Sequence, residues 1–124
     1  MAAGVLNDDK KSIGSSEQIL LESYADHKDF FSGNTVIGTI VTNAVLDKVQ
    51  ATKVAASGQD GIARCIRPAH SIYDGDTVFT MATGMVDAHL DAVSILAAKA
   101  VEGAILRAVS EAEELYGYIA AADL

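Results

Sequence analysis

The sequence predicts an α/β fold, because two strand-like segments alternate with two long amphipathic segments. Residues 35–42 and 76–83 are rich in apolar and β-branched side chains. Each is followed by a longer stretch, 47–66 and 87–116, in which apolar residues recur every three or four positions. From Thr35 onward the expected order is therefore strand, helix, strand, helix.

The residues before Thr35 differ from the rest of the chain. Ser15, followed three residues later by Gln18, resembles a helix capping box and favours a short helical turn, with a short strand as the alternative. Residues 24–34 are charged, aromatic and glycine-containing, which is typical of an exposed connector.

The first strand, 35–42, is almost wholly apolar, as expected for a strand buried on both faces. Gly38 within it predicts close packing of another element at that point. The helix that follows begins near Asp47 and ends before Pro68, since proline disfavours helix at the residue before it.

The second strand alternates along 76–83 and is expected to end at Gly84. The last helix is expected from its N-cap Asp87 to about Tyr116, and its alanine-rich stripe indicates close approach to a sheet or another helix. Two strands alone make a marginal sheet, so this unit needs further strands.

Composition excludes several classes of protein. A chain of 124 residues, half of them hydrophobic, has the length of one domain, and its net charge of −8 argues against a nucleic-acid partner. The apolar runs are too short to span a bilayer, and no secretory signal is visible. The single cysteine, Cys65, fits a reducing compartment and is expected to be buried on a helix. A cytoplasmic protein without a membrane partner is expected.

The first candidate site is the segment from Gly33 to Thr35. Thr35 opens a strand directly after a polar connector, and one interpretation is simply a β-branched residue at a strand start. The other is an N-terminal nucleophile. Cleavage between Asn34 and Thr35 would free an α-amine with an ordinary pKa of about 7.7–8.0 beside the hydroxyl, so one residue would hold nucleophile and base.

The second candidate site is the pair Asp74 and Asp76. In an extended backbone these two carboxylates point to the same side, and Gly75 between them allows close approach of another backbone. The pair fits proton sharing or binding of an ammonium group, and a plain polar turn is the alternative. His27, His70 and His89 do not have metal-ligand spacing, so no metal is expected, and His70 is either structural or lines the site.

Taken in order, these segments resemble the C-terminal part of the L-aminopeptidase/D-esterase family, which includes β-aminopeptidases and the endohydrolase of nylon (6-aminohexanoate) oligomers. The resemblance covers essentially the whole chain. Its segments are GNT at 33–35, IGTIVTNA at 37–44, KVA at 53–55, DGIARCIRPAH at 60–70, DGDTVF at 74–79 and ATG at 82–84.

The resemblance implies an autoproteolytic N-terminal-nucleophile-type hydrolase. Thr35 matches the nucleophile, the Asn34–Thr35 bond matches the cleavage site, and Asp74 with Asp76 matches the supporting polar pair. Threonine after asparagine with two aspartates is the set of the nylon-oligomer type, whereas the aminopeptidase type has serine with a serine and a glutamate. No cofactor is implied.

Family precursors are much longer than this chain. The resemblance implies that residues 1–34 form the tail of an α region with its cleavage linker, and that residues 35–124 form the β chain. Together they would be part of one larger four-layer αββα sandwich. An upstream segment would supply the other strands, an oxyanion-stabilising asparagine and a polar group such as lysine. A homo-oligomer is expected, and a non-catalytic assembly module is the competing hypothesis.

Overall fold

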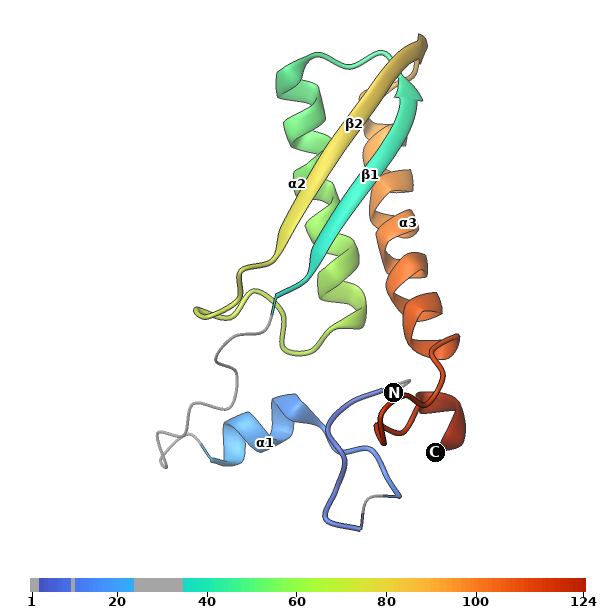
Figure 1. Ribbon diagram of the computed structural model, residues 1–124. Helices are drawn as coiled ribbons and strands as arrows, with labels where there is room; N and C mark the ends of the chain where they lie inside the picture. The colour runs from blue at the N-terminus through green and yellow to red at the C-terminus, as the bar shows by residue number, and fades with distance from the viewer. Residues whose placement is uncertain (1–2, 10, 24–34) are drawn as a thin grey trace.

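The computed structural model describes residues 3–9, 11–23 and 35–124, and a short helix precedes two strand–helix units (Figure 1). The elements are α1 (Ser16–Glu22), β1 (Ile37–Ala44), α2 (Lys48–Cys65), β2 (Thr77–Val86), α3 (Leu90–Ser110) and the 3-10 turn η2 (Ala121–Asp123). The α/β class and the order of elements after Thr35 are confirmed.

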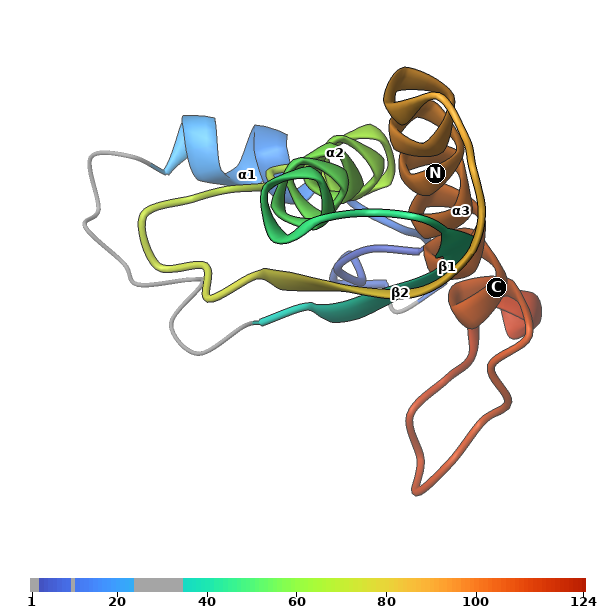
Figure 2. The same ribbon diagram turned by 90° about the horizontal axis from the view of Figure 1, so that it is seen from above.

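In the described part of the chain, β1 and β2 form a two-stranded parallel sheet in which Ile37 pairs with Thr77 and Ile40 with Thr80. Parallel neighbours require a crossover connection, and α2 supplies it. Figures 1 and 2 show α2 and α3 side by side on one side of the sheet. Since both strands run in the same direction, their first residues lie together at one end of the sheet.

The core lies between the two helices and the sheet face that they cover. Val54 and Ile62 of α2 are the largest fully buried side chains. Alternate residues of β1 point toward the helices, since successive strand side chains face opposite ways. The main cluster consists of Ile40, Ala44, Val54, Val93 and Ala97.

The opposite face of the sheet carries several large apolar side chains that are uncovered in the part of the chain that the structure describes. Ile37 is 73% exposed, Val41 is 68% exposed and Met81 is 60% exposed. The expected burial of both faces of the first strand is therefore met on one face only. Large apolar side chains gathered on one exposed sheet face indicate a surface for a further layer.

Two glycines let α2 approach its neighbours closely. A Cβ built at Gly58 would lie 2.7 Å from a side-chain carbon of β1, and one built at Gly61 would lie 2.5 Å from the Ala98 carbonyl oxygen. The close packing expected at Gly38 is absent among the described residues, where the nearest atom to a Cβ built there is Val78 Cγ2 at 3.9 Å. The close approach belongs to the helix rather than to the strand.

β2 continues past Gly84, which was wrongly predicted to end it. Gly84 has a φ of 70°, and the pairing register shifts between Thr42 and Ala44 so that Ala44 pairs with Val86. Glycine enters the left-handed region at little cost. The chain therefore makes a local irregularity and then resumes pairing.

α3 is shorter than predicted at both ends. It begins after His89 rather than after Asp87, because β2 uses more of the chain than expected, and His89 makes no side-chain capping bond. It ends at Ser110 rather than near Tyr116. Tyr116 and Gly117 have φ values of 54° and 83°, which a right-handed helix excludes.

α1 is a helix, as the capping pattern favoured. Ser15 is its N-cap, and its Oγ accepts the Gln18 N–H at 3.2 Å. The Gln18 side chain donates to Glu22 at 2.7 Å instead of returning to the cap, so the capping box is only half formed.

α2 begins with a complete capping box. The Asp47 carboxylate accepts the Gln50 N–H at 2.8 Å, and Gln50 Oε1 accepts the Asp47 N–H at 2.9 Å. We expect Asp47→Ala to lower the free energy of unfolding by about 1 kcal/mol, because it leaves a helix N–H without its partner. Urea unfolding measures this change. Asp47→Ser should stay close to the wild type, and equal losses for both variants would contradict a capping role.

Candidate active site

The start of β1 and the loop before β2 meet at one end of the sheet (Figure 1). The Thr77 N–H donates to the Val36 carbonyl oxygen at 2.9 Å. The Val36 N–H in turn donates to Oδ1 of the half-buried Asp76 at 2.8 Å. A hydrogen bond to a carboxylate is stronger than one between neutral groups. Asp76 therefore fixes the backbone directly after Thr35.

Thr35 lies against Gly75. A Cβ built on residue 75 would be 2.9 Å from Thr35 Oγ1 and 3.6 Å from Thr35 Cγ2, so a side chain there would crowd the threonine. A close approach at Gly75 is therefore present, but the Thr35 side chain makes it rather than another backbone. The Thr35 hydroxyl consequently lies beside the peptide segment that joins the two aspartates.

Asp74 makes a different set of contacts from Asp76. Its Oδ2 accepts the Ser71 N–H at 2.7 Å, and its own N–H donates to the Ser71 carbonyl oxygen at 3.1 Å. These two bonds close the turn from Ser71 to Asp74. Asp74 thus shapes the loop that presents Asp76 to the strand start.

The structure brings together Thr35, Gly75 and Asp76, with Asp74 next to them in the same loop. Asn34, the other residue of the predicted cleavage site, lies outside the described residues. The geometry thus places a hydroxyl and the Asp76 carboxylate at the beginning of β1, whereas the Asp74 carboxylate accepts a backbone N–H within the adjoining loop. A hydroxyl and a carboxylate at this point suit nucleophilic chemistry in which the carboxylate orients an amine.

Two polar side chains, Gln59 and His70, lie behind this group. Gln59 of α2 donates from Nε2 to the Asp76 carbonyl oxygen at 3.4 Å, and its Oε1 lies 3.2 Å from His70 Nε2. His70 was predicted to be structural or site-lining, whereas no role was predicted for Gln59. Only its position on α2, two and three residues before the buried Gly61 and Ile62, could have signalled a contact with the loop.

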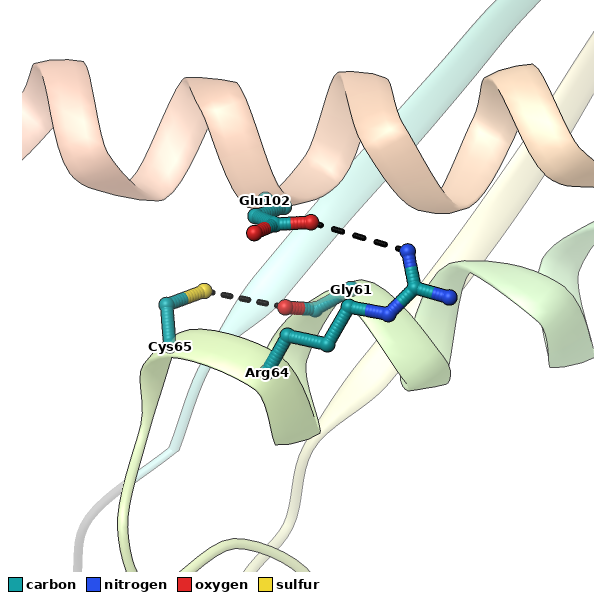
Figure 3. A network of polar contacts seen from close by, with 4 residues as sticks. All are labelled: Gly61, Arg64, Cys65 and Glu102. Carbon is teal, nitrogen blue, oxygen red and sulfur yellow. Dashed lines mark hydrogen bonds and ion pairs between the residues drawn. The ribbon is translucent and has the colours of Figure 1, made fainter.

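A polar cluster joins α2 to α3 (Figure 3). Arg64 Nη1 lies 3.6 Å from Glu102 Oε2, and the Cys65 thiol donates to the Gly61 carbonyl oxygen at 2.9 Å. Cys65 lies on a helix, as predicted, but it is half-buried rather than buried. Burial raises the pKa of the Cys65 thiol, and the nearby charge of Glu102 raises it further.

We expect the Cys65 thiol to react slowly with iodoacetamide in the folded chain. A raised pKa leaves less thiolate, and the thiolate is the reactive form. Mass spectrometry at about pH 8 should show slower alkylation of the folded chain than of the urea-unfolded chain. Glu102→Gln should reduce the difference in alkylation rate between the folded and unfolded chains, because it removes the charge that is the second cause of the raised Cys65 pKa. Equal rates in the two states would contradict this assignment.

Within residues 3–9, 11–23 and 35–124, no three side chains of His, Cys, Asp or Glu gather into a group able to hold a metal ion. Across the same ranges, none of the helices combines the length and the apolar character that crossing a membrane requires.

The model of peptidase family S58 matches residues 4–121. The chain belongs to peptidase family S58. This match and the relatives below confirm the resemblance to the L-aminopeptidase/D-esterase family.

Three relatives show how this S58 chain compares with longer proteins. It is 54% identical over 55 residues to an uncharacterised aminopeptidase of Mycobacterium leprae, which covers 44% of the chain and 15% of the relative. It is 51% identical over 53 residues to an uncharacterised aminopeptidase of Mycobacterium tuberculosis, and this match covers 43% of the chain and 15% of the relative. It is 38% identical over 56 residues to the 6-aminohexanoate-oligomer endohydrolase of Paenarthrobacter ureafaciens, and this match covers 45% of the chain and 16% of the relative. The matched part thus spans about a sixth of each relative.

Proposed function

We propose that this chain carries the nucleophile of a self-cleaving amidohydrolase. The chain cleaves itself between Asn34 and Thr35. Thr35 then hydrolyses amide bonds of small peptides or amino-acid amides through an acyl-enzyme, and Asp74 and Asp76 support it.

The observation that carries this proposal is the hydrogen bond from the Val36 N–H to Asp76 Oδ1, at 2.8 Å. It holds a carboxylate next to the residue that would become the new N-terminus. A carboxylate at that point suits an ammonium group, and the contact of Thr35 with Gly75 keeps the hydroxyl beside the same loop. A threonine in an ordinary strand start would need neither contact.

The chemistry follows from one residue with two functions. The Thr35 hydroxyl adds to the Asn34 carbonyl carbon, the C–N bond breaks, and the acyl group moves to oxygen while the amine is freed. Water then hydrolyses the ester, which gives an Asn34 carboxylate and restores the hydroxyl. In the mature site the free amine accepts the hydroxyl proton as Thr35 attacks a substrate amide, and passes it to the substrate nitrogen as the C–N bond breaks and the product amine leaves. A second water then hydrolyses the acyl ester, which releases the acyl group as a carboxylic acid and restores the hydroxyl.

In this proposal residues 1–34 form the tail of an α region and its cleavage linker, and residues 35–124 form the β chain. The uncovered apolar sheet face, with Ile37 73% exposed and Phe79 55% exposed, supports a second sheet packed against it in a four-layer αββα sandwich. An upstream segment of the same precursor supplies that layer. We further propose that the protein is a homo-oligomer and that it is cytoplasmic, and the single cysteine is in line with the cytoplasmic location.

We expect Asp76→Ala to slow self-cleavage about 10²-fold, because it frees the backbone after Thr35 and removes the nearby charge. Asp76→Asn should slow self-cleavage less than Asp76→Ala, since the asparagine amide oxygen can still accept the Val36 N–H. The rate of product formation, followed by intact mass, measures both variants. Asp60→Asn on the exposed side of α2 is the control. An Asp76→Ala variant that cleaves at the control rate would contradict the role of Asp76.

The cleavage itself is tested by intact mass after incubation. The chain is expressed as the longest polypeptide that its gene encodes, and two fragments are expected, one ending at Asn34 and one starting at Thr35. N-terminal sequencing identifies the second fragment. A single uncleaved species after prolonged incubation would overturn the proposal.

A second candidate is an endo-acting amidase of 6-aminohexanoate oligomers. It is favoured by the match to an enzyme with that printed name and by the combination of Thr35 with two aspartates. Parallel assays with amino-acid amides and with 6-aminohexanoate oligomers separate the two substrates. Release of internal oligomer fragments would favour the endo-acting enzyme.

The competing function is a non-catalytic assembly module that buries its apolar surface against another chain. Its support is the uncovered sheet face, where Val41 is 68% exposed and Met85 is 77% exposed. Size-exclusion chromatography of the Thr35→Ala chain tests it. A folded monomer without affinity for a hydrophobic dye would argue against it, whereas an intact assembly without any cleavage in the wild type would favour it.

A further inference from the structure

Gln59 connects three segments behind the candidate site. Its side chain projects from α2 toward the loop before β2 and contacts that loop at two points. Nε2 lies 3.4 Å from the Asp76 carbonyl oxygen, and Oε1 lies 3.2 Å from His70 Nε2. One amide group therefore joins a rigid helix to both ends of the loop segment 70–76.

The donor and acceptor roles in this contact are fixed by chemistry. The Asp76 carbonyl oxygen can only accept, so the Gln59 amide must turn its NH₂ group toward it and its oxygen toward His70. His70 must then donate from Nε2. Both the neutral tautomer with a proton on Nε2 and the doubly protonated ring meet this need, so the contact does not depend on the charge of His70.

The backbone of His70 adds a second constraint. His70 has a φ of 59°, a left-handed conformation that is uncommon for non-glycine residues, although Asn, Asp and His adopt it more often than the others. The next residue, Ser71, donates its N–H to Asp74 at 2.7 Å. The side chain of His70 is thus held by Gln59, while its backbone starts the turn that Asp74 closes.

We propose that Gln59 and His70 are positioning residues for Asp76. Gln59 holds the Asp76 main chain from the helix side, so that the carboxylate stays directed at the Val36 N–H, and His70 keeps the Gln59 amide in that orientation. The catalytic meaning of this inference rests on the proposed function. The geometric part of the inference is that the Asp76–Val36 contact depends on Gln59, and this part does not rest on the proposed function.

The geometric content is tested by amide hydrogen exchange in the full 124-residue chain. Thr35→Ala serves as the background, so that cleavage does not alter the strand start. Gln59→Glu keeps the shape and the contact with His70 but presents an acceptor to the Asp76 carbonyl oxygen. Gln50→Glu is the matched control, because a carboxylate at residue 50 still accepts the Asp47 N–H.

We expect Gln59→Glu to speed exchange of the Val36 amide about tenfold or more, while the amides of Val54 and Ile62 in the core of α2 keep their protection. Gln50→Glu should leave all three unchanged. Unchanged Val36 exchange in Gln59→Glu would overturn the inference. Equal loss at Val36, Val54 and Ile62 would also overturn it, since that pattern marks general destabilisation.

His70 variants provide a second, uncharged test. His70→Gly keeps the left-handed backbone but removes the donor, and it should expose the Val36 amide as Gln59→Glu does. His70→Asn tolerates the same backbone and restores a donor, so it should recover protection at least in part. Failure of His70→Gly to change Val36 exchange would remove His70 from the proposal.

In chains that retain Thr35, Gln59→Glu and His70→Gly should slow self-cleavage about 10–10²-fold, as expected for a displaced supporting group. His70→Asn should cleave faster than His70→Gly. If the wild type does not cleave at all, the proposed function fails, and the amide exchange still decides whether Gln59 positions Asp76. If cleavage occurs but neither variant slows it, the positioning role fails alone.

Discussion

Thr35→Ala is expected to abolish self-cleavage, with a loss of about 10³-fold or more, because it removes the only hydroxyl that can add to the Asn34 carbonyl carbon in the proposed step. The fold should survive this change. Thr35 is exposed, so little apolar packing is lost. Intact mass over time, at equal protein concentration, gives the rate.

Two further variants make this expectation specific. Thr35→Ser keeps a hydroxyl on the same backbone and should cleave, whereas Thr35→Val keeps the branched shape without the hydroxyl and should not. Cleavage by the valine variant would show that another group breaks the chain. Failure of the serine variant alone would indicate instead that the methyl group, which faces Gly75, is needed to orient the hydroxyl.

The sequence predicts the kind and order of the elements because each has a strong local signal. The β-branched run after Thr35 gives β1, and the run of three- and four-residue spacings between Asp47 and Pro68 gives α2. The errors lie where a long-range pairing or a backbone conformation overrides the local signal. Gly84 predicts the end of a strand, yet strand pairing continues beyond it, because Ala44 pairs with Val86.

The candidate site is predicted only in part, for a similar reason. Thr35 and the pair Asp74 and Asp76 stand out as residue types in suggestive positions. That Asp76 rather than Asp74 contacts the strand start depends on the path of the loop, which residue spacing does not determine. Gln59 lies in the middle of a helix, where a glutamine is unremarkable until the tertiary structure brings the Asp76 carbonyl group to it.

Gly61→Ala is expected to destabilise the fold by about 1–2 kcal/mol, although helix propensity alone favours alanine by about 1 kcal/mol. At this point α2 packs closely against the backbone of α3. Figure 3 shows Gly61 on the side of α2 that faces α3. A Cβ on residue 61 would lie 2.5 Å from the Ala98 carbonyl oxygen and 3.0 Å from the Glu102 nitrogen. Neither atom belongs to a flexible side chain, so the two helices must move apart and lose contact along their shared face.

Gly103→Ala provides a matched comparison within α3. The nearest atom to a Cβ built at Gly103 is Arg107 Nη1 at 3.5 Å, the end of a flexible side chain. This substitution should raise the free energy of unfolding by about 0.5–1 kcal/mol, because alanine loses less backbone entropy than glycine. Urea unfolding of both variants should therefore give changes of opposite sign. Stabilisation by Gly61→Ala would show that α2 and α3 do not approach as closely as the structure has them, and the α2 positions of Gln59 and Gly58 would then need revision as well.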